Sequence, residues 1–140
     1  MIACSGHALA AGAILLLVGD VRVGALGEFK IGLNEVSIQM TLPVFAMELA
    51  RDRLSPRYLT AATTQARVFD PLGAANAGYL DELVEPGQVA DRALEHARRL
   101  ALLPQPAFRQ TKLRERGASV ARIRATLADD IATLTQPAAP

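Results

Sequence analysis

The chain lacks several features that would place it in a specialised class of proteins. It has one cysteine, Cys4, in 140 residues, so it has neither an internal disulfide nor a CxxC pair for a metal or redox site. Its 15 lysine and arginine residues nearly balance 14 acidic residues, and no basic stretch is interleaved with aromatic residues. We therefore expect no nucleic-acid partner, a structural role for Cys4 and a location in the reducing cytoplasm.

A long hydrophobic run is also absent. The most apolar stretch, residues 8–18, would reach only about 16 Å as a helix, whereas the hydrocarbon core of a bilayer is roughly 30 Å thick. It also lacks the basic region that precedes the apolar part of a signal peptide, because the first cationic residue is Arg22. We expect a buried core helix here, and no membrane partner.

Hydrophobic residues make up 51% of the chain, which is enough to build a packed core. Short β-like segments are concentrated near the start, at residues 1–4, 21–23 and 29–31. The apolar helix between the first two, at residues 9–18, is typical of a βαβ crossover. An irregular loop follows at residues 32–35.

The rest of the chain is predicted to be mainly helical. Pro43 opens one helix, and Ser55 and Asp70, each followed by proline, are predicted to cap the next two. After a brief extended segment at residues 79–85, a turn at Pro86 leads into a helix that ends before Pro104. The last helix has an apolar seam of Val120, Ile123, Leu127, Ile131 and Leu134, which we expect to pack on a neighbouring element. These few strands cannot bury both faces of a sheet, so we expect further strands upstream of Met1.

Three segments, in the same order, resemble the crotonase (enoyl-CoA hydratase/isomerase) superfamily. Residues 2–13 read Ile-Ala-Cys-Ser-Gly-His-Ala-Leu-Ala-Ala-Gly-Ala, like the family's strand, glycine turn and glycine-rich helix start. Residues 20–25 read Asp-Val-Arg-Val-Gly-Ala, like the strand that follows, and Phe29 occupies the place of a family phenylalanine. Residues 70–81, with Val84, Pro86 and Val89, are similar to the family's x-A-x-x-x-G-L-V-D-x-V-V-P run.

This resemblance implies an α/β fold, namely the C-terminal part of a crotonase-type ββα spiral with few strands, followed by a mainly helical region. The resemblance covers residues 1 to about 116 of this chain. In the family, the domain begins well upstream of the position that matches Met1. The resemblance divides the chain into a partial crotonase core (1–87) with the oxyanion helix and active-site loop, a C-terminal helical region (88–136) and a tail (137–140). The segment at residues 29–36 resembles a divergent subgroup.

The resemblance also implies a chemistry, in which backbone N–H groups stabilise the enolate oxygen of a coenzyme A thioester. Ala11 matches one donor of this oxyanion hole, and the second donor lies in the upstream half of the family. Gly6, His7, Gly12 and Leu33 match positions near the substrate. The residue types alone are also compatible with purely structural roles, because small residues serve helix packing and a loop histidine needs no ligand.

Proton transfer in this family uses glutamate. Glu35 matches one such position if a two-residue shift is allowed, although an exposed loop carboxylate is the alternative. Ile14 occupies the position of the other, and an aliphatic side chain cannot move a proton. One remaining glutamate suits a double-bond isomerase better than a hydratase, which must also activate water.

Two functional hypotheses follow from the resemblance. The first is an N-terminally truncated enoyl-CoA hydratase/isomerase-like enzyme, weak or inactive alone, with an acyl-CoA substrate, no cofactor, no metal and a homo-oligomer of trimer type. The second is an inactive crotonase remnant that acts only in oligomer assembly.

Four further polar residues have weaker expectations. Lys112, Arg114 and Arg116 suit either the 3′-phosphate of coenzyme A or a solvated helix face, and His96 is expected to be a solvated or edge residue.

Overall fold

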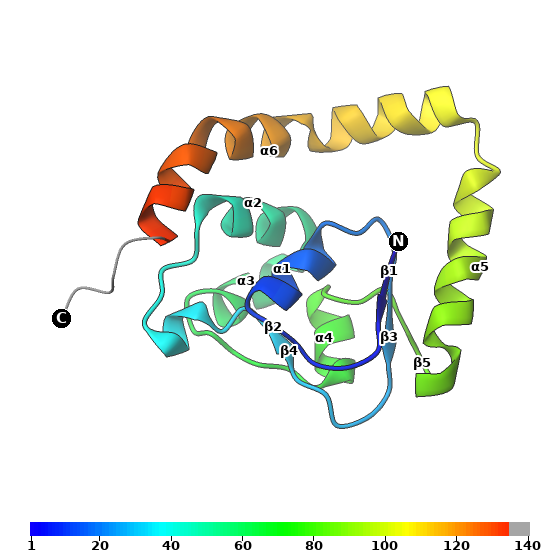
Figure 1. Ribbon diagram of the computed structural model, residues 1–140, viewed down its shortest axis with the longest axis horizontal. Coiled ribbons are helices and arrows are strands. Elements are labelled where there is room, and N and C mark those ends of the chain that lie inside the picture. The colour runs from blue at the N-terminus through cyan, green and yellow to red at the C-terminus, as the bar shows by residue number, and fades with distance from the viewer. Residues whose placement is uncertain (135–140) are drawn as a thin grey trace.

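The computed structural model describes residues 1–134, in which two small parallel sheets are covered by helices (Figure 1). The first sheet has the order β1-β3-β5 and the second pairs β2 with β4, and all these pairings are parallel. The strands are β1 (Ile2–Cys4), β2 (Ala8–Leu9), β3 (Arg22–Ala25), β4 (Ile31–Gly32) and β5 (Glu82–Val84). Parallel neighbours require crossover connections, and α1 (Ala11–Leu17) is the crossover between β1 and β3, as predicted.

The apolar helix α1 begins two residues later than predicted. Leu9 belongs to β2, where it pairs with Gly32, and Ala10 has a φ of 48° that is incompatible with a right-handed helix. The predicted strand at residues 29–31 is likewise displaced, because β4 begins at Ile31. In both cases the boundary is set by the pairing of β2 with β4, two strands that are distant from each other in sequence.

Four further helices complete the part around the sheets. They are the 3₁₀ helix η1 (Glu35–Ile38), α2 (Val44–Arg53), α3 (Pro56–Ala62) and α4 (Pro71–Ala77). Asp70 caps α4 as predicted, accepting a hydrogen bond from the Gly73 N–H at 2.6 Å, but the Ser55 side chain makes no capping bond to α3. Gly78 ends α4 with a φ of 98°, and a Cβ there would lie 2.6 Å from the Arg53 carbonyl oxygen. Glycine is therefore required at this point.

Two long helices enclose the rest of the molecule. After the 3₁₀ helix η2 (Pro86–Gln88), α5 (Val89–Ala101) packs Val89 and Ala93 against Val23 and Ala25 of β3. A sharp turn then leads into α6 (Gln105–Leu134), which lies over α2 (Figure 1).

The strands precede the predicted boundary at residue 87, and helices alone follow it within residues 88–134. The predicted tail (137–140) and the end of the predicted helical region, residues 135–136, lie outside the described residues. Among residues 1–134, no helix combines the length and the apolar character needed to span a bilayer.

Candidate active site

The pairing of β2 with β4 brings together the two segments that carry the predicted catalytic groups. The Ala8 N–H donates to the Lys30 carbonyl oxygen at 2.9 Å, and the Ala10 N–H donates to the Gly32 carbonyl oxygen at 3.1 Å. The first residue of α1 therefore follows one strand of this pair, and η1 follows the other. Because the two strands are parallel, α1 and η1 both begin beyond the same edge of this small sheet.

Ala11, the predicted oxyanion donor, is the first residue of α1 and is exposed. An N–H in the first turn of a helix has no partner within the helix, and the helix dipole favours a negative charge beside it. The preceding Ala10 has φ 48° and ψ −119°, which is a strained conformation for a residue with a Cβ. Such strain costs about 1–3 kcal/mol and is concentrated at functional sites.

Helix packing does not account for the glycine at position 12. A Cβ at Gly12 would meet only the Ala8 Cβ, at an ordinary contact distance of 3.8 Å. A Cβ at this half-buried position would therefore fit. This observation weakens the alternative in which the small residues at the head of α1 serve packing alone.

Glu35 is buried, with only 4% of its surface exposed, although it is a charged residue in a short 3₁₀ helix. The alternative of an exposed loop carboxylate is therefore wrong. Burial raises the pKa of Glu35, and a hydrogen bond from its own backbone N–H only partly opposes this rise. Its Oε2 atom is buried and has no hydrogen-bond partner among the described residues. A buried carboxylate with a free oxygen can accept a proton from a bound ligand.

Tyr79 is a member of this site that the sequence did not reveal. Its side chain is fully buried, and its hydroxyl accepts a hydrogen bond from the Leu33 N–H at 3.4 Å. Burial raises the pKa of Tyr79, and the charge of Glu35 raises it further, so the phenol stays protonated close to the carboxylate. The available signal was a tyrosine at the position where the crotonase pattern has leucine.

The other predicted substrate residues lie in two places. Leu33 is fully buried in the main core, which favours a packing role for its side chain. His7 is exposed on the loop before β2, where its Nδ1 accepts a hydrogen bond from the Lys30 N–H at 2.9 Å and its ring packs edge-on against Phe29. Gly6 also lies beside Phe29, so β2 separates both residues from the head of α1.

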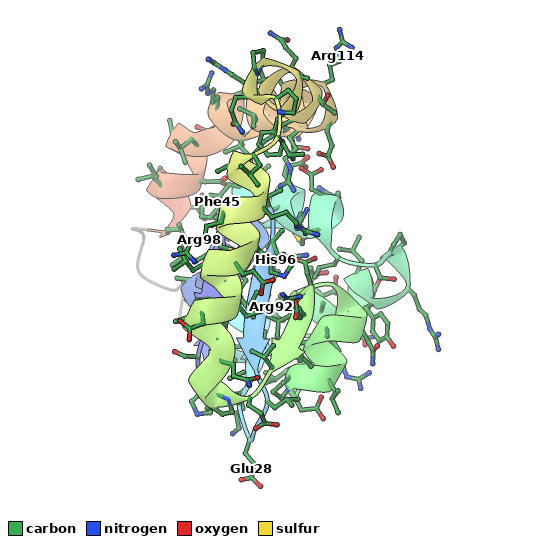
Figure 2. The ribbon with its side chains drawn as sticks, turned by 90° about the vertical axis from the view of Figure 1, so that its right-hand side faces the viewer. Glu28, Phe45, Arg92, His96, Arg98 and Arg114 are labelled. Carbon is green, nitrogen blue, oxygen red and sulfur yellow. The ribbon has the colours of Figure 1, made fainter. Side chains whose placement is uncertain are left out.

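Two residues for which a solvated position was one of the alternatives, His96 and Lys112, contact carboxylates. The Nε2 atom of His96 lies 2.6 Å from a carboxylate oxygen of Glu82 on β5, and its side chain is 12% exposed. Figure 2 shows His96 and Arg92 on one side of α5 and Arg98 on the other. On α6, the Nζ atom of Lys112 lies 2.6 Å from a carboxylate oxygen of Asp20. No three histidine, cysteine or acidic side chains gather as possible metal ligands within residues 1–134.

The sequence and the fold are both similar to those of known enoyl-CoA enzymes. Mitochondrial enoyl-CoA delta isomerase 1 of Homo sapiens is 27% identical over 122 residues, which are 86% of this chain and 40% of that protein. No family model matches the chain.

Solved structures of enoyl-CoA proteins superpose closely. An enoyl-CoA hydratase of Mycobacterium ulcerans has a TM-score of 0.89 and 42% identity, with 95% of this chain and 58% of that chain covered. Human mitochondrial delta3-delta2-enoyl-CoA isomerase has a TM-score of 0.84 and 26% identity, with 90% of this chain and 49% of that chain covered. The chain thus spans well under two thirds of the length of these relatives. This agreement of fold and sequence shows that the chain has the crotonase (enoyl-CoA hydratase/isomerase) fold over part of the length of these proteins.

Proposed function

We propose that the chain carries the carboxyl-terminal half of an acyl-CoA isomerase site, in which Ala11 binds the thioester oxygen and Glu35 transfers the proton. The observation that carries this proposal is the buried Oε2 of Glu35, which lacks a partner within residues 1–134 and follows the strand paired with the oxyanion segment. The names of the similar proteins, which include both hydratases and isomerases of enoyl-CoA, supply the class of substrate.

The reaction needs a negative charge to be stabilised on the thioester oxygen while a proton leaves the neighbouring carbon. The Ala11 N–H at the positive end of α1 would donate to that oxygen, and the absence of larger side chains at Ala10 and Gly12 leaves room for the thioester. A second donor, in the part of the family upstream of this match, would complete the oxyanion hole. Losing one such donor typically lowers the rate by about 10²–10³.

Glu35 would take the proton from the α-carbon of a 3-enoyl-CoA and return it to the γ-carbon. The double bond moves between these events, and the carboxylate ends in the protonation state in which it began. Burial raises the pKa of Glu35, which makes its carboxylate a stronger base than an exposed one. Ile14, at the other glutamate position of the family, packs against the core and cannot activate water. Isomerisation therefore suits this chain better than hydration.

The test is exchange of the α-proton of an acyl-CoA in D₂O, because this partial reaction needs only an oxyanion donor and a base. We expect the purified chain to catalyse slow exchange, and Glu35→Gln to lower the rate by about 10²-fold or more. Glu28→Gln is the matched control, since Glu28 is an exposed glutamate on the loop between β3 and β4 and points away from the molecule (Figure 2). Exchange that is equally fast in the wild type and in Glu35→Gln would refute the role of Glu35.

A second candidate is the inactive remnant that acts only in oligomer assembly. The apolar seam of α6 favours it, because four of its residues stay exposed: Val120, Leu127, Ile131 and Leu134. We propose a cytoplasmic homo-oligomer of trimer type under either candidate. A wild-type chain that associates with rising concentration in sedimentation, yet shows no exchange with any acyl-CoA, would favour the remnant.

A further inference from the structure

A cavity of about 280 Å³ lies between the end of α2, the turn at Asp20 and α6. Two arginines from different helices, Arg53 and Arg116, line it together with Lys112. Asp20 follows the carboxyl-terminal end of α1, whereas Ala11 is at the opposite end of that helix. The cavity is therefore separate from the candidate active site.

The two arginines have far more hydrogen-bond donors than acceptors. The Arg53 side chain is 14% exposed, makes one long hydrogen bond of 3.3 Å to the Asp20 carbonyl oxygen, and has a buried Nε without a partner among the described residues. The Arg116 side chain is 13% exposed, and its ionic contact with Glu115 is 4.0 Å long, beyond hydrogen-bond distance. Largely buried cations are costly unless acceptors satisfy them.

Two of the acidic groups nearby are already engaged by other partners, and the third, the exposed Glu115, lies 4.0 Å from Arg116. Asp81 binds Arg22 at 2.6 Å and reaches Arg53 only at 3.9 Å. Asp20 binds Lys112 at 2.6 Å. Burial lowers the pKa of Arg53, and the positive charges of Arg22 and Arg116 lower it further, while Asp81 and Asp20 offset only part of this effect. Arg53 therefore stands in a local excess of positive charge.

We propose that this cavity binds a phosphate group, held between the guanidinium groups of Arg53 and Arg116. A guanidinium presents a planar fork of donors that matches two phosphate oxygens, and it stays charged at any physiological pH. The phosphate would supply acceptors to both side chains and reduce the repulsion between them. Its source is either free inorganic phosphate or a phosphate monoester of a larger molecule.

The test is calorimetric titration of the full chain with inorganic phosphate and with methyl phosphate, in potassium chloride of matched ionic strength. We expect saturable binding of at least one, weakened about tenfold or more by Arg116→Gln and by Arg53→Gln, because each removes charge-assisted hydrogen bonds. Arg114→Gln is the matched control, since Arg114 lies two residues away on α6 and points away from the molecule (Figure 2). The Arg114→Gln variant should bind phosphate with the same affinity as the wild type.

Nitrogen-15 NMR of the arginine Nε–H groups provides a second readout that does not depend on the folding of the variants. In the wild type, phosphate should shift the Nε–H signals of Arg53 and Arg116 and leave that of Arg114 in place. Tighter binding of methyl phosphate would indicate a phosphate monoester as the source, and tighter binding of inorganic phosphate would indicate the free ion. The absence of saturable binding, or equal weakening by Arg116→Gln and Arg114→Gln, would overturn the proposal.

Discussion

At the scale of single residues, Glu35 combines a cost to the fold with a use in the proposed reaction, and both arise because it is buried. Its sequence neighbours at Val36, Ser37 and Ile38 are all exposed, so its burial reflects the direction of one side chain in η1. The raised pKa of Glu35 means that the folded state favours the protonated form relative to the unfolded state. Ionisation of this carboxyl therefore opposes folding.

This sign predicts how Glu35→Gln changes stability with pH. The contribution of the protonated carboxyl is fully present below its unfolded pKa and is lost as the pH rises through the higher folded pKa. At neutral pH the variant should thus be more stable than the wild type, by on the order of 1 kcal/mol. Thermal unfolding from pH 3 to pH 8 measures this, and the difference should vanish at the acidic end. A variant that is less stable than the wild type at pH 8 would contradict the prediction.

At the scale of elements, the attachment of α6 depends on a carboxylate that the sequence pattern did not single out. Asp130 is buried, and its two oxygens accept hydrogen bonds from the N–H groups of Val44 and Phe45, at 2.8 and 3.0 Å. Pro43, at the N-cap of α2, has no side chain that could provide this cap. Asp130 of α6 therefore caps the start of α2, although the residues that it joins are more than eighty positions apart in sequence.

We predict that Asp130→Ala lowers stability by about 1–2 kcal/mol, the usual value of a helix cap. Hydrogen exchange should also accelerate at the Val44 and Phe45 amides, which lose their acceptor. Asp129→Ala is the control, because Asp129 is an exposed neighbour on the same helix. Similar protection of both amides in Asp130→Ala and Asp129→Ala would show that the cap does not stabilise α2.

The apolar seam of α6 was recognisable from its spacing, but its environment was not. Ile123 and Leu127 line a cavity together with Phe45 and Leu49 of α2, so only part of the seam lies against a neighbouring element. Val120 and Leu127 nevertheless keep two fifths of their surface exposed. Periodicity identifies an apolar face, whereas the shape of the partner surface decides how much of it is covered.

At the scale of the whole molecule, one ion pair connects two segments that lie 59 positions apart in sequence. Arg22 of β3 is buried and forms two side-chain hydrogen bonds with Asp81, at 2.6 and 2.8 Å, and one with the Gly78 carbonyl oxygen at 2.6 Å. Burial alone would raise the pKa of Asp81, but the hydrogen bonds and charge of Arg22 outweigh it and lower that pKa. The pair therefore ties β3 to the segment between α4 and β5.

We predict that Asp81→Asn destabilises the chain by about 2–3 kcal/mol at neutral pH, because it leaves the buried Arg22 charge without its partner. The stability that Asp81 contributes is present above its unfolded pKa and is lost as the pH falls through the lower folded pKa. The difference between variant and wild type should therefore shrink in acid. Urea unfolding at several pH values measures this, with Asp129→Asn as the control for a general loss of charge. A difference independent of pH would indicate a cause distinct from the ion pair.

The sequence by itself determined the order of the elements, the apolar faces and the similarity to the crotonase superfamily. These depend on local spacing, on caps such as Asp70 and on motif residues that are read along the chain. It also placed Ala11 near the start of a helix and Glu35 after a short strand. The catalytic roles of both residues remain predictions.

Only the tertiary structure decided the burial of Glu35, the contact of Tyr79 with Leu33, the start of α1 at Ala11 and the cap from Asp130. Each depends on segments that are distant in sequence, and a local pattern contains no information about which distant groups will exclude water or supply an acceptor. The pairing of β2 with β4 is the physical reason at the candidate site. It sets where α1 begins, and it carries η1 to the same edge of the small sheet.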